Sequence, residues 1–308
     1  MTSRPQAAAP DPASDGAPFA VRRIGLVVHP KREIDTALAY TRAWTRDNGV
    51  ELYQIRVHGQ ERVVADPGDV AAGDLVLAIG GDGTTLHALH AAAKADQPVL
   101  GVACGSLGAL TAVPAEDLED ALARVARGEW MPKRLPGVSV TVDGAPERVA
   151  INDVVVVRRG AGQVIVEITV VGDVFVRYAG DGIVVATPAG SSAYTLAAGG
   201  PILAGSSDGI VLTPIAPHGG CCPPLVAGPG SEVSLRIESG YGGSRLEFDG
   251  QIDDTQPAEM RLARVEGYAT LVKLGGEESF LTALRRRRIL IDSPRVLARD
   301  DRAALRQP

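Results

Sequence analysis

"AIGGDGTTLH", residues 78–87, places three glycines around one aspartate, between an apolar run and a helical pattern. The residues before the glycines, LVLAIG (75–80), predict a buried strand because they form a short continuous apolar run. The residues after them, TTLHALHAAAKA (84–95), repeat apolar side chains at helical spacing. In open α/β folds, ligands bind where a strand ends and the chain turns into a helix. This stretch therefore predicts an α/β fold and also the place of its site.

The glycines of this loop favour contact with phosphate. Gly80, Gly81 and Gly83 have no Cβ, so backbone N–H groups here can closely approach a polyphosphate. The following helix adds the positive end of its dipole. Asp82 in such a loop can coordinate Mg²⁺ or orient a hydroxyl nucleophile. The alternative is a tight strand–helix turn in which Asp82 only caps the helix.

Two kinds of pattern divide the chain. From about residue 21 to 135, short apolar runs alternate with helical periodicity, which predicts an α/β N-terminal domain with a largely parallel sheet. From 136 to 282 the chain is rich in valine and often broken by Gly, Pro and Asp, which predicts a β-rich C-terminal domain. We expect residues 1–20 to be a disordered tail, and residues 283–308 to return to the first domain. The active site is expected in the cleft between the two domains. The expected helices are 33–49, 84–95, 116–128 and 278–288.

Composition limits the classes of partner. The chain has 308 residues, 45% of them hydrophobic and 4% aromatic, and a net charge of −6, which gives no general attraction to nucleic acid or to an anionic membrane. It has no apolar stretch of about 18 residues, and its start lacks the apolar centre of a secretory signal. Cys104, Cys221 and Cys222 are an odd number, which favours reduced thiols. We therefore expect a cytoplasmic protein that binds neither nucleic acid nor membrane.

A second stretch, GDGIVVATPAGSSAYTLAAGGPI (180–202), gathers short hydroxyl side chains and one tyrosine between glycines. A β-turn followed by an ordinary loop is one interpretation. It leaves unexplained why Ser191, Ser192 and Tyr194 lie together. Hydroxyls that form hydrogen bonds and an aromatic face that stacks are what a loop around a sugar and a base requires.

Together, in this order and spacing, the two stretches resemble the NAD kinase family. The likeness extends from about residue 22 to 282. The GGDGT element alone also occurs in diacylglycerol kinases, sphingosine kinases and phosphofructokinases, but its combination with the TP-x-GS-x-AY loop is specific. Further segments that carry the resemblance are LGVACGSLGAL (100–110), INDVVV (151–156), LTPIAPH (212–218) and FDGQ (248–251).

The resemblance implies transfer of a phosphoryl group from ATP to the 2′-hydroxyl of the adenosine ribose of NAD. It also implies a divalent cation such as Mg²⁺ and a homodimer or homotetramer. By the same resemblance, Asp82 is the general base on the acceptor hydroxyl, and Gly81, Gly83 and Thr84 belong to the phosphate loop. The acceptor-binding positions that the resemblance implies are Asn152, Asp153, Asp181, Ser192, Ala193 and Tyr194.

Several family positions differ in this chain, and most of them fall on the acceptor side. Ala103 stands where the family has Asn, Ala109 where it has Phe, and Ala189 where it has Thr or Ser. Asp153 is shorter than the usual Glu, and GGCCPPLV (219–226) replaces a segment that normally contains Ser, a large apolar residue and Arg. Two hypotheses therefore stand beside an NAD kinase. One is a kinase of the same fold that is specialised for the 2′-hydroxyl of another nucleoside or nucleotide. The other is a non-catalytic dinucleotide-binding protein, against which the intact Asp82 loop argues.

The histidines do not predict a metal site. His87 and His90 lie three residues apart on the predicted helix, but no third ligand is near them in the sequence, so we expect exposed or packed side chains. His218 is expected to shape the pocket on the oligomer side or to pack structurally. We assign no protein metal-ligand set from the sequence.

Overall fold

The computed structural model describes residues 20–57, 61–276 and 278–304. The chain divides into one compact unit, Met1–Glu277, and a second, Glu278–Pro308, and each is described by itself. The predicted tail, apart from residue 20, lies outside the described residues, as do the last four positions of the closing segment.

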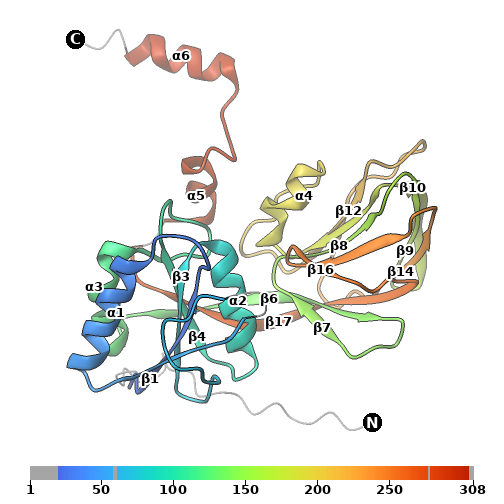
Figure 1. The fold of residues 1–308 in the computed structure, drawn as a ribbon. Helices are drawn as coiled ribbons and strands as arrows, with labels where there is room; N and C mark the ends of the chain where they lie inside the picture. The colour runs from blue at the N-terminus through green and yellow to red at the C-terminus, as the bar shows by residue number, and fades with distance from the viewer. Residues whose placement is uncertain (1–19, 58–60, 277, 305–308) are drawn as a thin grey trace. The chain divides into compact units, whose positions relative to one another are not determined.

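The first unit contains helices, 3-10 turns and strands that alternate early and become almost all strand later (Figure 1). Its helices and 3-10 turns are α1 (Asp35–Asp47), α2 (Asp82–Ala93), η1 (Ala115–Asp117), α3 (Leu118–Ala126), η2 (Gly190–Ser192) and α4 (Tyr194–Ala197). The strands of its first half are β1 (Arg23–Val28), β2 (Glu51–Gln54), β3 (Leu75–Gly80), β4 (Pro98–Ala103), β5 (Val113–Pro114), β6 (Met131–Val142) and β7 (Arg148–Ala150). The remaining strands are β8 (Asp153–Arg158), β9 (Val164–Val170), β10 (Asp173–Gly180), β11 (Gly182–Ala186), β12 (Ile210–Ile215), β13 (Leu225–Ala227), β14 (Val233–Ser239), β15 (Ser244–Phe248), β16 (Gln251–Asp253) and β17 (Glu259–Lys273).

The α/β part is built on four parallel strands in the order β2-β1-β3-β4. Strands β3 and β4 are buried along their whole length because helices cover both faces, and this explains their continuous apolar sequences. One core contains residues of α1 and α3, such as Leu38 and Leu122, and the other contains Leu86 and Leu89 of α2. Helices α1 and α3 therefore cover one face of the sheet and α2 covers the other (Figure 1).

The β-rich part is a sandwich of two sheets. One continues the α/β sheet: β17 pairs in parallel with β4 and then antiparallel with β14, followed by β9 and β10. The other has the order β13-β12-β11-β8-β15-β16. Side chains from both sheets fill the core between them, including Val156 and Ile168. The strands thus form two sheets, one of which is shared by the α/β and β-rich parts.

The two long strands β6 and β17 carry the chain from one part into the other. They pair with each other along most of their length, with an irregularity between Val265 and Ala269. Leu135 of β6 packs in the core beside α2, whereas Val138 of the same strand packs between the two sheets of the sandwich. The sequence-based division of the chain at 135/136 remains a prediction.

The strand order places a topological switch point of the parallel sheet at the site. The chain leaves β1 toward β2 on one side of it and returns to β3 on the other, so β1 and β3 flank the switch point of the parallel sheet. Their carboxyl ends are joined by a hydrogen bond from the His29 backbone N–H to the Ile79 carbonyl, 2.9 Å. Ligands of open α/β sheets bind at such switch points. The GGDG loop follows β3 at this place.

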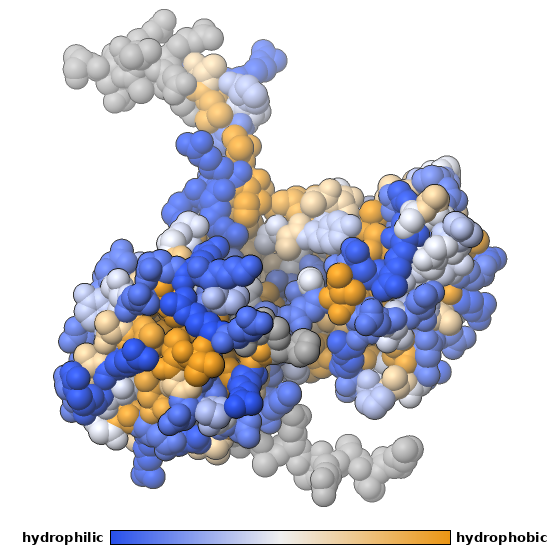
Figure 2. Space-filling model, viewed as in Figure 1, coloured by the Kyte–Doolittle hydropathy of each residue, from blue (hydrophilic) through white to orange (hydrophobic). Residues whose placement is uncertain are grey.

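The face of the molecule seen in Figure 2 is mainly hydrophilic and also carries apolar patches. In the part of the chain that the structure describes, every helix is too short or too polar to cross a bilayer.

The second unit contains α5 (Phe280–Arg286) and α6 (Pro294–Ala304). Ser279 caps α5 by accepting a hydrogen bond from the Thr282 N–H at 3.3 Å, and Arg286 pairs with Glu278 at 2.8 Å. Helix α5 lies within the helix expected at 278–288. The return of this segment to the first domain remains a prediction.

Candidate active site

Asp82 is the first residue of α2, and its carboxylate is held by backbone donors of the segment after β4. Asp82 Oδ2 accepts the Ala109 N–H and Oδ1 accepts the Leu110 N–H, each at 2.9 Å. A Cβ on Gly108 would lie 2.0 Å from Asp82 Oδ1. A carboxylate oxygen has two lone pairs and can accept more than one hydrogen bond. The carboxylate is thus fixed in orientation and still able to act on a hydroxyl.

The predicted phosphate-loop residues lie at the junction of β3 and α2. Gly80 ends β3, where a Cβ would be 2.3 Å from the Thr84 hydroxyl oxygen, so glycine is needed for this turn. Thr84 itself is buried. A Cβ on Gly81 would meet the guanidinium of Arg32 at 3.1 Å, and one on Gly83 would meet nothing within 4 Å. Gly81 and Gly83 therefore form the accessible part of the loop.

Arg32 is a site residue that the sequence analysis missed. It lies in the turn after β1, where His29 Nδ1 accepts the N–H groups of Lys31 at 3.1 Å and Arg32 at 3.0 Å. Its guanidinium donates to the Cys104 carbonyl at 3.4 Å, and Arg62 donates to the Arg32 carbonyl at 2.7 Å. Burial, followed by the charges of Arg32 and Arg62, lowers the pKa of His29, which favours the neutral ring that accepts these bonds. The position of this turn at the end of the first parallel strand was the available sequence signal.

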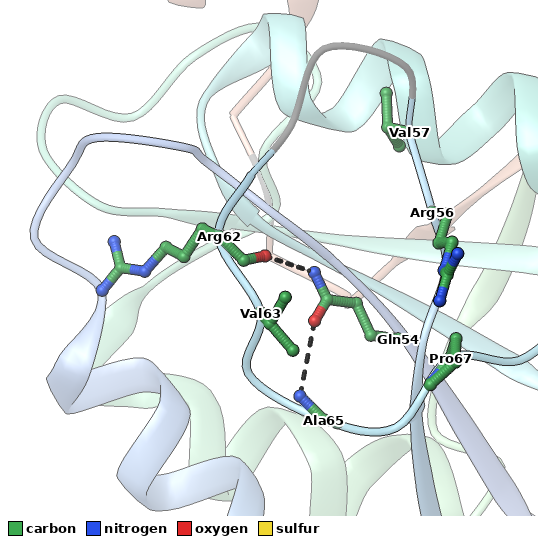
Figure 3. Close-up of a pocket in the computed structure, with 7 residues that line it drawn as sticks. All are labelled: Gln54, Arg56, Val57, Arg62, Val63, Ala65 and Pro67. Atoms are coloured by element: carbon green, nitrogen blue, oxygen red, sulfur yellow. Dashed lines mark hydrogen bonds between the residues drawn. The ribbon is translucent and has the colours of Figure 1, made fainter.

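Cavities lie beside Arg32 and beside the edge of the sheet in the α/β part. One, of about 360 Å³, runs beside Arg32 and the end of β4, and its lining includes Arg32, Ile34, Ala37, Ala103, Cys104 and Gly105. The other, of about 500 Å³, lies beside the edge strand β2 (Figure 3). There the Gln54 amide holds the following loop by donating to the Arg62 carbonyl at 2.7 Å and accepting the Ala65 N–H at 3.4 Å (Figure 3). None of the site residues predicted from the sequence lines this second cavity.

Asn152 and Asp153 lie where the chain enters β8. Their N–H groups donate to Oδ1 of Asp249 at 2.6 and 3.1 Å. Asp153 is buried, with 6% of its surface exposed. Burial, then the negative charges of Asp249 and Glu247, raise the pKa of Asp153 from 3.8 to about 7. A pKa of about 7 means that the Asp153 carboxyl changes charge near neutral pH.

The histidines of α2 contact the FDGQ turn, which sequence reasoning left without a role. His90 Nε2 lies 2.6 Å from Asp249 Oδ2, and His87 contacts the Gln251 amide. Burial, then the charge of His90, lowers the pKa of His87. Among the residues that the structure describes, no group of three or more His, Cys, Asp or Glu could hold a metal ion. Both histidines pack against the turn, which is one of the roles expected for them.

The second stretch singled out in the sequence, 180–202, contains β11 and then the second loop, which begins at Thr187. This loop packs against the outer face of the six-stranded sheet through Leu203, the residue that follows the stretch. Ser191 is fully buried, donates to the Pro188 carbonyl at 2.7 Å and accepts the Leu203 N–H at 2.9 Å. Its hydroxyl therefore holds the loop together, and the expectation that it faces a sugar is wrong. Tyr194, by contrast, is 38% exposed.

The other candidates for acceptor binding differ in their hydrogen bonds and in their exposure. Asp181 Oδ1 accepts from Arg158 Nε at 2.6 Å. Ser192 donates to the Ala189 carbonyl at 3.3 Å and is half-buried, and Ala193 is exposed.

The positions that differ from the family motifs also lie around these loops. Ala103 is buried at the end of β4, where it pairs with Gly80, while Ala109 is exposed beside Asp82. Cys221 is an exposed free thiol, and Cys222 packs against the core of the sandwich.

We expect Asp153→Asn to stabilise the protein more at pH 8 than at pH 5. A carboxyl whose pKa is raised by folding favours the native state at low pH and loses that contribution as pH rises from 3.8 through about 7. The loss amounts to at most about 1.4 kcal/mol per pH unit in that interval. Urea unfolding of wild type and variant at both pH values measures it. Asp254→Asn, at a fully exposed position, is the control, and an equal gain at both pH values for Asp153→Asn would contradict the assignment.

The sequence is similar to protein-family models and to other proteins. Residues 25–130 match the ATP-NAD kinase N-terminal domain, and residues 151–274 match the ATP-NAD kinase C-terminal domain. An NAD kinase of Gemmatimonas aurantiaca is 36% identical over 69% of this chain and 76% of its own. NAD kinase 1 of Streptomyces avermitilis is 32% identical over 92% of this chain and 91% of its own.

Solved structures share the fold. Yeast NADH kinase complexed with NADH has a TM-score of 0.72 at 18% identity and covers 89% of each chain. An NAD kinase from Archaeoglobus fulgidus in complex with ATP has a TM-score of 0.67 at 24% identity, covering 87% of this chain and 100% of that one. With matching domain models over both of its parts, the chain belongs to the ATP-NAD kinase family.

Proposed function

We propose that this protein is a kinase that transfers the γ-phosphoryl group of ATP to the 2′-hydroxyl of the adenosine ribose of NAD and so produces NADP. The observation that carries the proposal is the Asp82 carboxylate, fixed by two backbone N–H groups at the start of a helix and beside an accessible glycine loop. The two matching family domains and the relatives named NAD kinase support it.

In the proposed step, the ribose 2′-oxygen attacks the γ-phosphorus and the bond to the β–γ bridging oxygen breaks, which leaves ADP. The hydroxyl proton passes to Asp82. A carboxylate is a weak base, but the transition state of phosphoryl transfer is loose, so early deprotonation is not required. Orientation of the hydroxyl by Asp82 and stabilisation of the phosphoryl charge then contribute most of the acceleration.

The donor phosphates are placed at Gly81 and Gly83. The first turn of α2 directs backbone N–H groups and the positive end of the helix dipole there. Arg32, whose guanidinium lies over Gly81, adds a fixed positive charge at the same place.

The residues at this place fit Mg²⁺. This cation is commonly bound by one or two carboxylates together with substrate phosphates and water, so it needs no cluster of three protein ligands. Asp82, whose carboxylate stands at the start of α2 beside the glycine loop, is the residue that would hold it. When bound, Mg²⁺ neutralises charge on the transferring phosphoryl group.

The acceptor is placed between the entry to β8 and the second loop. Asn152 and Asp153 lie at the entry to β8, and the Thr187 N–H donates to the Asn152 carbonyl at 2.9 Å, which brings the loop that carries Ser192, Ala193 and Tyr194 next to this entry. Asp181, which accepts from Arg158, comes just before β11, at the opposite end of β8 from Asp153, so within this chain it stands apart from the other acceptor-binding candidates. The 38% exposure of Tyr194 leaves an aromatic face available for stacking on a base.

We expect Tyr194→Ala to raise KM for NAD by roughly three- to tenfold and to change kcat less, because a stacking contact is made equally in the ground state and the transition state. Steady-state kinetics at saturating ATP measure both constants. Tyr241→Ala, which removes a 90% exposed tyrosine elsewhere in the β-rich part, is the control. A fall in kcat with unchanged KM would remove Tyr194 from the acceptor site.

The second candidate is a kinase of this fold specialised for another ribosyl acceptor. It is favoured by Ala109, which is exposed beside Asp82, and by Ala189 in the second loop. Purified protein with ATP and Mg²⁺ should be tested on NAD, NADH and simple nucleosides, as wild type and as the Ala109→Phe/Ala189→Thr variant. We expect NAD to be the best acceptor and the variant to use it equally well or better. A better nucleoside acceptor, hindered by the same substitutions, would favour the second candidate.

The protein is also proposed to act in the cytoplasm as a homodimer or homotetramer. Three free cysteines, one of them exposed, suit a reducing compartment. The acidic net charge gives no reason to expect nucleic acid or an anionic membrane as a partner.

A further inference from the structure

Asp249 occupies the turn between β15 and β16, at the edge of the six-stranded sheet. Phe248 pairs with Gln251, so Asp249 and Gly250 form a two-residue hairpin turn, with positive φ angles of 52° and 75°. Such turns favour Asn or Asp followed by Gly. The turn alone therefore explains a short polar side chain at 249 but does not require a carboxylate.

The carboxylate of Asp249 instead serves another segment of the chain. Oδ2 accepts the Ile151 N–H at 2.9 Å, and Oδ1 accepts the Asn152 and Asp153 N–H groups at 2.6 and 3.1 Å. The Asp249 N–H donates back to the Asp153 carbonyl at 2.9 Å. Only 4% of this side chain is exposed. Three converging amides need an acceptor with several lone pairs, which an ionised carboxylate provides and an amide does not.

His90 connects this carboxylate to the helix that begins at Asp82. Its Nε2 lies 2.6 Å from Asp249 Oδ2, which is hydrogen-bond distance, and the tautomer with a proton on Nε2 donates to this oxygen. The Tyr268 hydroxyl of β17 lies 3.5 Å from the other ring nitrogen, and the two rings meet edge to face. His90 is about two helical turns after Asp82. One chain of contacts thus runs from the catalytic helix to the backbone at 151–153.

We propose that Asp249, held by His90, is a positioning residue for the acceptor: its carboxylate fixes the Asn152–Asp153 backbone relative to the helix that carries Asp82. This inference rests on the proposed function only in taking Asn152 and Asp153 as acceptor-binding residues. Loss of the pair should loosen the acceptor side of the site and leave the donor side unchanged, because the contacts of Arg32 with Gly81 and with the Cys104 carbonyl involve none of the residues of this turn.

The chain contains a matched control for a purely structural role. Asp143 and Gly144 form a similar turn, with φ angles of 47° and 75°. The Asp143 carboxylate also accepts backbone N–H groups, from Glu259 at 2.7 Å and Ala258 at 3.2 Å, and its own N–H donates back to the Glu259 carbonyl. These contacts join β6 to β17 and involve none of the proposed site residues.

Asp249→Asn places another residue that the turn favours at this position and removes the carboxylate. His90→Ala removes the side chain that contacts this carboxylate, whereas His90→Gln keeps an N–H donor. We expect Asp249→Asn and His90→Ala to raise KM for NAD about tenfold and to leave KM for ATP within about twofold. His90→Gln should restore most of the loss. Asp143→Asn should lower stability without changing either KM. Equal effects of Asp249→Asn and Asp143→Asn, or equal changes in both KM values, would overturn the proposal.

A second measurement tests the inference without any acceptor substrate. Amide hydrogen exchange of the full-length protein should be at least about tenfold faster at 151–153 in His90→Ala than in wild type, and unchanged there in Asp143→Asn. Unchanged exchange in His90→Ala would overturn the inference. Failure of the wild type to phosphorylate NAD would instead contradict the proposed function, and the exchange rates would still decide the inference.

Discussion

Asp82→Asn is expected to lower kcat by at least about 100-fold, the usual size of a general-base contribution, and to leave the fold intact. Asparagine matches aspartate in shape and can still accept the Leu110 N–H, but it cannot take the hydroxyl proton. Because the loss arises in the transition state, kcat and kcat/KM should fall together.

Initial rates of wild type and variant at saturating ATP and NAD, with thermal unfolding as the folding check, measure this effect. Asp120→Asn is the matched control because Asp120 also lies in the first turn of a helix, α3, and is exposed. Turnover of Asp82→Asn within a few-fold of wild type would remove Asp82 from the mechanism.

Gly108→Ala is expected to have an effect of similar size through a different cause. A Cβ at this position would lie 2.0 Å from Asp82 Oδ1, so the carboxylate must leave its place between the Ala109 and Leu110 donors. A displaced catalytic group commonly costs about 100-fold in rate. The protein should remain folded because the clash is with a half-buried side chain at the start of a helix.

The measurement is again kcat, with the melting temperature as a check on folding. Gly228→Ala is the control, because a Cβ there would meet no atom within 4 Å and the backbone does not have a positive φ. Full turnover of Gly108→Ala would show that the position of the Asp82 carboxylate between the Ala109 and Leu110 N–H groups is not required for catalysis.

The hydrophobic patterns of short segments were sufficient to predict much of the fold. The apolar run 75–80 and the helical spacing that follows it became β3 and α2, because a parallel strand covered on both faces needs a continuous apolar sequence. The glycines at 80, 81 and 83 predict a phosphate loop for a reason visible in the sequence, the need for close backbone approach, and this assignment remains a prediction. The same kind of argument assigned Ser191 to the ligand, and there it failed, because hydroxyl groups also bond to the backbone of their own loop.

Other features depend on contacts between residues far apart in the sequence, which the pattern within one segment cannot predict. Strand β17 joins the two parts of the molecule by pairing with β4, about 170 residues before it, and its register is not encoded in its own sequence. The contact between His90 and Asp249 spans 159 residues. Arg32 reaches Gly81 only because β1 and β3 are neighbours in the sheet. A residue pair of this kind becomes visible only when the strand order is known.

The most direct test of the account is identification of the product that the wild type forms from NAD, ATP and Mg²⁺. Phosphorus-31 NMR of the reaction mixture, followed over time, distinguishes a 2′-phosphate on the adenosine ribose from other phosphomonoesters. We predict NADP and ADP in equal amounts and no product from the Asp82→Asn variant on the same timescale. Absence of NADP from the wild type, under conditions in which it phosphorylates another ribosyl compound efficiently, would contradict the account.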